Sequence, residues 1–335
     1  MNPDLFLNYA LQMGVPIPSA NEYLDILRSL EQWLAKRGIP INDIALKDLR
    51  KYLKHLIKTN QNTIDSVLVL KEYYFLAGRT DLMVFLSEVS DYLLDFENIV
   101  DHLEEYVGKV AADEIRFMDL TPPYGTDPNE LPVYTEEFLR ALYKSFPEDI
   151  IRKSLSNRND GIIPASYEME RSLYQNSASM DEYLLASARM KEIRYFGMRF
   201  AKSRWGDLFF PEEYLRFVSQ FQEMLSGVRR DGTIYVTQEP LLPGRYRKTK
   251  SFARRRYYAC QDPYVRASFL NKKASISVVW CERCVSRCKQ KFEYLLERPL
   301  TAEVVECAIM GDTLCRFAIH LNGSTVPQDR TGIQD

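Results

Sequence analysis

Three cysteines stand close together in the segment CERCVSRCKQKF, at positions 281, 284 and 288. The first two have the Cys-x2-Cys spacing of a metal-binding knuckle, and structural zinc takes four ligands of this kind. With a fourth thiolate from Cys260, the sequence predicts a zinc or iron site made of Cys260, Cys281, Cys284 and Cys288. No second Cys-x2-Cys pair and no pair of histidines completes the pattern, so other interpretations of the cysteines stay open.

The same thiols also suggest covalent chemistry. Cys284 and Cys288 are one turn apart at the start of a predicted helix, where a thiol has a lowered pKa, and basic neighbours favour the thiolate further. A nucleophilic Cys281 or Cys284, with His320 as a conceivable base, would make the protein a hydrolase. The third interpretation is that the cysteines are small residues of a core.

The last apolar segment, AEVVECAIMGDTLCRFAIHL, predicts a β-hairpin because apolar residues alternate along both of its halves. Both apolar rows share one face if Cys307 lies opposite Phe317 and Ile309 opposite Cys315, with a three-residue turn over 311–313. In that register Cys307 and Cys315 are diagonal neighbours, a poor geometry for a disulfide. We therefore expect both thiols, with Phe317, to line a core or a pocket.

A basic run, RYRKTKSFARRRY, holds seven Lys and Arg residues, three aromatic residues and no acid. This mixture suits a nucleic-acid backbone or a pocket for a small anion, and a solvated surface segment is the simplest alternative. We place Arg254, Arg255 and Arg256 near the mouth of the predicted pocket. The segments GTIYVT, FARRRYYAC and SISVVW are rich in β-branched or aromatic residues and are predicted to be strands.

The sequence predicts two units, and the cysteines, the basic run and the hairpin all lie in the second. Leucines recur at helical spacing through residues 19–112, which predicts an all-helical module over 1–120. The proline-rich stretch TPPYGTDPNELP cannot continue a helix and predicts a linker over 121–133. Beyond it we expect a mixed α/β domain over 134–325, ending in the hairpin, and a disordered tail over 326–335. The predicted fold class is α+β.

One helix of the first unit has a basic stripe opposite its leucines, which predicts a DNA-binding face made of Lys47, Arg50, Lys51, Lys54 and Lys58. A solvated helix face is the default explanation. The run YLDILRSLEQWLAKRGI with its two following helices resembles the helical core-binding domain of phage-type tyrosine recombinases. Recombinase catalysis is excluded, because no histidine in the chain is followed three residues later by arginine.

A second resemblance covers residues 243–321 through the segments RYYACQDPYVRASF, VVWCERCVSRCKQKFE and VVECAIMGDTLCRFAI. These are similar to a poorly characterised bacterial family related to aminothiazoline-carboxylate hydrolases and 4-vinyl-reductase-type ligand-binding domains. The family carries Cys-x-Cys-Pro in the first segment; here Cys260 matches the first cysteine, and Asp262 stands in place of the second. The resemblance implies an α/β domain around a small-molecule pocket, with Asp262 or Cys288 completing a ligand set.

The composition sets the remaining limits. A net charge of −2 gives no overall attraction to nucleic acid or membrane, and no apolar run approaches the roughly 20 residues that span a bilayer. The N-terminus has no basic lead, so we expect a cytoplasmic protein whose thiols are reduced.

The favoured function is sensing or binding of a small molecule or metal in a cysteine-lined pocket that includes Cys307, Cys315 and Phe317. The alternatives are a hydrolase of a small sulfur- or nitrogen-containing heterocycle and a DNA-associated accessory protein. Whether the protein is an enzyme stays open. The expected partners are a small-molecule ligand, with DNA or a second copy of the chain as further alternatives, and no membrane.

Overall fold

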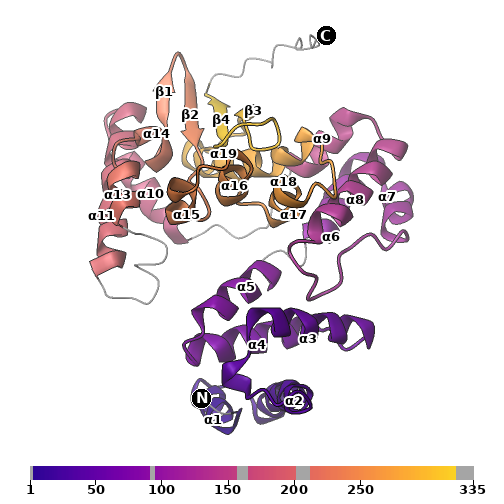
Figure 1. Ribbon diagram of the computed structural model, residues 1–335. Helices are drawn as coiled ribbons and strands as arrows, with labels where there is room; N and C mark the ends of the chain where they lie inside the picture. The colour runs from indigo at the N-terminus through magenta and orange to yellow at the C-terminus, as the bar shows by residue number, and fades with distance from the viewer. Residues whose placement is uncertain (1–2, 91–94, 157–164, 201–211, 322–335) are drawn as a thin grey trace.

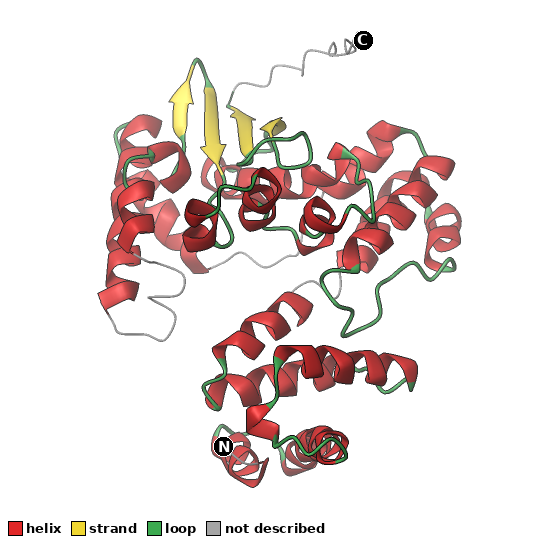
Figure 2. Cartoon of the chain, viewed as in Figure 1, coloured by secondary structure: helices red, strands yellow, loops and turns green. Residues whose placement is uncertain are grey.

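The computed structural model describes residues 3–90, 95–156, 165–200 and 212–321 (Figure 1). Helices dominate it, and one small antiparallel sheet is formed by segments from the last third of the chain, which agrees with the predicted α+β class (Figure 2). Within the described residues, no helix combines the length and the apolar character that crossing a membrane requires.

The first unit of the structure is helical. Its elements are α1 (Pro3–Gln12), α2 (Ile17–Ala35), the 3-10 helix η1 (Ile41–Asp43), α3 (Leu46–Lys58), α4 (Ile64–Leu76) and α5 (Thr80–Ser90). The leucines that predicted these helices are buried together, with Leu27, Leu30 and Leu34 of α2 facing Leu49 and Leu53 of α3 in one hydrophobic cluster. Helical periodicity therefore identified the inward faces correctly.

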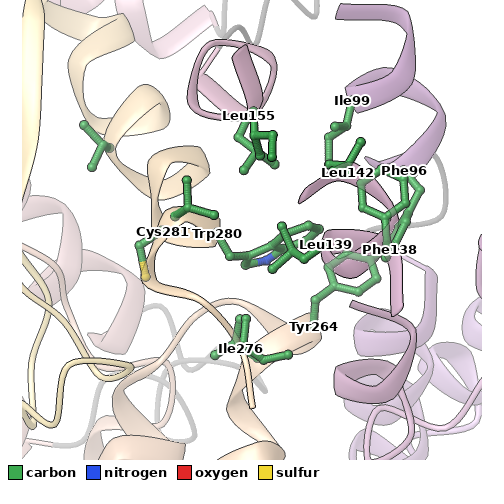
Figure 3. Packing of buried hydrophobic residues seen from close by; sticks show 14 of the residues in the cluster. Phe96, Ile99, Phe138, Leu139, Leu142, Leu155, Tyr264, Ile276, Trp280 and Cys281 are labelled. Carbon is green, nitrogen blue, oxygen red and sulfur yellow. The ribbon is translucent and has the colours of Figure 1, made fainter. Parts of the chain in front are cut away.

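The next helices belong to a different core. They are α6 (Asp95–Val107), α7 (Lys109–Arg116), α8 (Leu131–Ser145) and α9 (Glu148–Ser156). Phe96 of α6 and Phe138 of α8 have ring centroids 4.7 Å apart, and Phe96 also contacts Tyr264 and Trp280 from the last third of the chain (Figure 3). The hydrophobic clusters thus divide between α5 and α6, earlier than the predicted boundary at 121–133, because periodicity shows which residues turn inward but not which unit they face.

The proline-rich segment packs against the first unit. Asn62 Nδ2 donates to the Tyr124 carbonyl oxygen at 3.1 Å, and Arg50 forms an ion pair with Asp127 at 2.9 Å. Gly125 is buried with a φ of +88°, and a Cβ there would lie 3.6 Å from the Leu53 Cβ. A positive φ of this kind favours glycine, so the segment turns tightly over α3.

The remaining helices and the sheet come from the part of the chain after α9. The helices are α10 (Ala165–Gln175), α11 (Met180–Phe200), α13 (Glu212–Val218), α14 (Gln222–Leu225), α15 (Pro243–Lys248), α16 (Phe252–Ala259), α17 (Pro263–Arg266), α18 (Ser268–Asn271), the 3-10 helix η2 (Val278–Cys281) and α19 (Glu282–Leu296). The strands are β1 (Val228–Arg230), β2 (Thr233–Thr237), β3 (Thr301–Glu306) and β4 (Arg316–His320), in the order β1-β2-β4-β3. Ile234 of β2 and Ile319 of β4 are paired and pack with Phe292 and Leu295 of α19, so α19 covers one face of the sheet.

Two predicted strands are wrong. The segment GTIYVT does form β2, but FARRRYYAC forms α16 and SISVVW ends in η2. In both failures a serine caps the helical start: Ser251 accepts from the Arg254 amide, and Ser277 accepts from the Val279 amide. Strand propensity depends strongly on context, and here local capping and burial outweigh the aromatic and β-branched composition.

The predicted hairpin register is also wrong. Val304 pairs with Phe317, and a bulge follows before Glu306 pairs with Arg316. The connection runs from residue 307 to residue 315 instead of making a three-residue turn, so Cys307 does not lie opposite Phe317, nor Ile309 opposite Cys315.

The long connection has its own internal bonds. The Cys307 amide donates to Asp312 Oδ2 at 3.0 Å, and the Asp312 amide donates to the Cys307 carbonyl oxygen at 3.1 Å. These bonds satisfy backbone groups that strand pairing would otherwise serve, and they fold Cys307 and Ala308 into the core.

Candidate functional site

Four of the six cysteines line one small cavity. Cys260 follows α16, Cys281 ends η2, Cys284 lies in the first turn of α19, and Cys315 precedes β4. The other lining residues are Gln238, Gln261, Asp262, Val265, Trp280, Ala308, Ile309 and Phe317. The expected convergence of Cys260, Cys281 and Cys284 is thus found, and Cys315 and Phe317 join them as predicted. We call this space the thiol cavity.

The thiol cavity is very small. Its volume is about 10 Å³, which is close to what a single water molecule requires. In this conformation the thiol cavity has no room for an organic ligand.

Most of these thiols are held in the protonated form. Burial raises the pKa of Cys260 and Cys284, and it raises the pKa of Cys315 to about 12. A metal ligand must be a thiolate, so a metal ion bound here would have to displace these protons. Across the described ranges, no three His, Cys, Asp or Glu side chains are arranged to hold a metal ion. The predicted zinc or iron set is also divided, because Cys288 lines a different cleft.

Asp262 has a structural role. Its Oδ1 accepts from the Tyr264 amide at 2.9 Å and caps α17, and its Oδ2 accepts from Trp280 Nε1 at 3.1 Å. The Arg283 guanidinium lies 4.0 Å from the same Oδ2. Both carboxylate oxygens are therefore engaged in anchoring Trp280, Arg283 and the turn after Cys260, and Asp262 does not stand in for a metal-binding cysteine.

Cys281 and Cys307 form a hydrogen-bonded pair of thiols. The Cys281 thiol donates to the Cys307 sulfur, and this bond, helped by the backbone amides of Met310 and Ile309, lowers the pKa of Cys307 to about 7. The same bond raises the pKa of Cys281. Cys307, the acceptor of this pair, is fully buried, and the pKa values of the predicted nucleophiles Cys281 and Cys284 are raised.

His320 is remote from the thiols. It ends β4, five residues beyond Cys315, which is about 16 Å along an extended strand. Its Nε2 lies 3.5 Å from the Glu303 carboxylate and its Nδ1 lies 3.1 Å from the Thr233 hydroxyl. The conceivable cysteine–histidine dyad is therefore not formed.

A larger, open cleft lies beside the thiol cavity. We call it the outer cleft; its volume is about 490 Å³. Its charged centre is Glu239, whose carboxylate accepts from the hydroxyls of Tyr195 at 2.7 Å and Tyr214 at 2.5 Å and pairs with Lys191 Nζ at 2.5 Å. Burial, with the adjacent carboxylate, raises the pKa of both tyrosines, so they stay hydrogen-bond donors at any ordinary pH.

Two glutamines form the shared wall of the outer cleft and the thiol cavity, since both line both spaces. Gln238 Nε2 donates to Gln261 Oε1 at 2.9 Å, and Gln261 Nε2 donates to the Glu239 carbonyl oxygen at 2.8 Å. Cys288 also lines the outer cleft, and burial raises its pKa to about 11. The hydrogen-bonded pair Gln238–Gln261 therefore lies between the thiol cavity and the open cleft.

Sequence reasoning missed the outer cleft. Lys191, Tyr195 and Tyr214 come from helices α11 and α13, and Glu239 follows β2. Together they match no motif that links them in sequence. The only local signal is the polar sequence Thr-Gln-Glu directly after an apolar strand, which is common in ordinary loops.

The predicted arginines are divided between surface and cavity. Arg256 Nε donates to the Ala308 carbonyl oxygen at 2.6 Å, and its guanidinium lies 4.4 Å from the Phe269 ring centroid. Ala308 lines the thiol cavity, so Arg256 holds part of the cavity wall. Arg254 and Arg255 are exposed and line neither space.

The basic stripe on α3 is largely neutralised. Three of its five side chains form ion pairs within the chain: Arg50 with Asp127 at 2.9 Å, Lys51 with Asp48 at 3.3 Å and Lys54 with Glu130 at 3.6 Å. Lys47 and Lys58 are exposed. A stripe that is paired in this way is a weak footprint for DNA.

Comparisons with known proteins add no assignment. No family model matches the chain, and neither the curated proteins nor the solved structures contain a significant match.

Proposed function

We propose that this protein binds a small polar molecule in the outer cleft. The observation that carries the proposal is the convergence of Lys191, Tyr195, Tyr214 and Glu239 on a space of about 490 Å³. Ligand sites are typically concave, with apolar walls and a few polar groups that converge from different elements. Here the apolar part of the wall comes from Met224, Val236, Pro240, Leu241 and Pro243.

The polar groups indicate the ligand's chemistry. Lys191 supplies a cation, and Glu239 supplies a carboxylate that already accepts three donors. A ligand with both an anionic oxygen for Lys191 and an amino group for Glu239 would exchange the internal ion pair for two equivalent ones, so no buried charge would lose its partner. Small zwitterions, such as free amino acids and related amino carboxylates, satisfy both requirements.

The thiols would contribute beside the polar groups. Cys288 faces the outer cleft directly, and the thiol cavity lies behind the Gln238–Gln261 bond. Sulfur is soft and polarisable and favours apolar or sulfur-containing groups of a ligand. A change in the two glutamine side chains would join the thiol cavity to the outer cleft.

The alternative activities are less well supported. A thiol hydrolase needs an accessible thiolate, but the thiol in the cleft has a pKa of about 11 and Cys281 and Cys284 are held as thiols. A metal sensor needs a preformed ligand set, and DNA binding needs a free cationic face. Binding of a small molecule in the outer cleft needs none of these three features, and it is therefore the function that the geometry favours.

The proposal is tested by a thermal-shift screen with the twenty amino acids and a set of amino carboxylates. A ligand of the native state raises Tm with concentration. We expect at least one compound to raise Tm of the wild type and of the control variant Glu213→Gln, whose side chain is exposed on α13 and does not line the cleft.

The same compound should give no rise in Tm with Glu239→Gln or with Lys191→Met. Comparing ligand-induced shifts, rather than Tm values, separates lost binding from lost stability. If no compound shifts the wild type, or if the shifts persist in both variants, the outer cleft is not the ligand site.

A further inference from the structure

A second, larger cleft lies at the edge of the second hydrophobic core, beside Asn62 of the first unit. Its volume is about 790 Å³, and its walls come from α6, α7, α8 and the proline-rich segment, with Asn62 contributed by the first unit. Phe96 and Phe138, which contact each other in Figure 3, form its buried floor. Tyr124 and Tyr134 are half-buried in its walls. We call this space the junction cleft; it shares no lining residue with the outer cleft.

The junction cleft lies in an acidic part of the chain. Residues 95–119 contain eight Asp and Glu and two Lys and Arg, a net charge of −6, whereas the whole chain carries −2. Glu97, Asp101 and Asp119 are exposed carboxylates in its lining. Charges of one sign around a concave surface raise the local concentration of ions of the opposite sign.

The single cation of the lining does not offset these acids. Arg116 is bonded to Asp101 at 2.6 Å, to Glu104 at 2.8 Å and to Asp113 at 2.6 Å. Three carboxylates around one guanidinium leave an excess of negative charge. Arg116 therefore fixes the positions of three carboxylates, and the exposed carboxylates of Glu97 and Asp119 are available to a ligand.

We propose that the junction cleft binds an organic cation, an ammonium or quaternary ammonium group attached to an apolar or aromatic body. Aromatic faces attract such cations through their quadrupole, and the half-buried Tyr124 and Tyr134 supply two such rings, with Phe96 and Phe138 buried beneath them. The apolar body would cover the ring surfaces and the two prolines Pro122 and Pro123, while the carboxylates at the rim neutralise the charge. An anion of the same shape would meet repulsion from the same carboxylates.

Binding in the junction cleft would also affect how the two units pack. Asn62 belongs to the first unit and donates to the Tyr124 carbonyl oxygen across the junction at 3.1 Å. A bound cation would contact residues on both sides of this bond and would stabilise the packing of the two cores against each other. Sites between packed units are among the commonest places for ligands.

The test uses three probes that share a benzyl group and differ in charge: benzyltrimethylammonium, benzyl alcohol and phenylacetate. Binding is measured with the full chain by isothermal titration calorimetry and by shifts of protein NMR signals. We expect saturable binding of benzyltrimethylammonium that weakens as salt is raised, with at least about tenfold weaker binding of the neutral and anionic probes.

Variants locate the site. Glu97→Gln combined with Asp119→Asn removes two rim carboxylates. The double substitution should lower the affinity for the cationic probe about fivefold, which is the scale of two partly screened charges. The matched control Glu114→Gln removes an exposed acid of α7 that does not line the cleft and should leave the affinity unchanged.

Three results would overturn the proposal: no saturable binding of benzyltrimethylammonium to the wild type, equal affinity for phenylacetate, or equal affinity in the double variant and the wild type. Because the outer cleft shares no residue with this site, failure here leaves the amino carboxylate screen unaffected, and the reverse also holds.

Discussion

Replacing Asp262 by asparagine tests how the thiol cavity is held together. The amide has the shape of the carboxylate and keeps an oxygen for the Tyr264 amide, so the cap of α17 can survive. The negative charge beside Arg283 is removed, and Arg283 is only 6% exposed. The asparagine NH2 group cannot accept from Trp280 Nε1, so the substitution removes the charge beside Arg283 together with one hydrogen bond of the anchor.

The magnitude follows from the 4.0 Å separation of the Arg283 and Asp262 atoms. With an effective dielectric constant of about 20, two unit charges at this distance attract by about 4 kcal/mol. Arg283 keeps its contacts with the rings of Trp280 at 4.8 Å and Tyr264 at 5.5 Å, so part of its stabilisation survives. We expect Asp262→Asn to lower the free energy of unfolding by about 2–4 kcal/mol, as is usual when one partner of a buried pair is lost.

Urea denaturation followed by tryptophan fluorescence measures this change in a Trp33→Phe, Trp205→Phe background, where the signal comes from Trp280, which donates to Asp262. The control is a double-mutant cycle with Arg283→Met, which removes the buried cation as well. The double variant should be more stable than Asp262→Asn alone, and it keeps the test valid if the single variant does not fold. A loss below about 1 kcal/mol, or a double variant no more stable than Asp262→Asn, would refute the anchoring role.

Three further outcomes are expected. Burial raises the pKa of the Cys288 thiol from 9.0 in the unfolded chain to about 11 in the folded protein. The stabilisation that this shift gives is therefore complete below pH 9 and is lost as the pH rises to 11. Between pH 8 and pH 10 in urea titrations, the free energy of unfolding of Cys288→Ala should fall by roughly 1.4 kcal/mol less than that of the wild type. Iodoacetamide at pH 7.5 should modify Cys281 and Cys284 at least about a hundredfold more slowly in the native protein than in 8 M urea, and rapid modification of either residue would restore the hydrolase hypothesis. A double-mutant cycle of Arg50 and Asp127 should give a coupling of about 0.5–1 kcal/mol in urea titrations, and zero coupling would mean that the Arg50 side chain is free for another partner.

The sequence predicted those features that depend on local periodicity or close spacing. The inward leucines of α2 and α3 follow from the helical repeat, and β2 follows from the alternation in GTIYVT. The meeting of Cys260, Cys281 and Cys284 was expected from their spacing and from the resemblance of three separate segments. These features need little knowledge of how distant parts of the chain pack.

Other features depend on tertiary contacts that no local pattern records. The segment FARRRYYAC has the composition of a strand, but Ser251 caps it as a helix and Arg256 bonds to the hairpin connection. The hairpin register was wrong because Asp312 bonds within the connection and allows a longer loop than the alternation implied. The family resemblance implied Asp262 as one of two alternatives for completing a metal-ligand set, whereas its carboxylate accepts from Trp280 and lies beside Arg283.

The proposed role of the outer cleft is tested most directly by the reactivity of Cys288, the thiol in its lining. Methyl methanethiosulfonate at pH 9 modifies Cys288, and peptide mass spectrometry gives the rate at this residue alone. With a saturating amount of an amino carboxylate identified in the thermal-shift screen, we expect the rate at Cys288 to fall at least about tenfold in the wild type, because the occupied cleft excludes the reagent, and to be unaffected in Glu239→Gln. An unchanged rate in the wild type at saturation would contradict binding in the outer cleft.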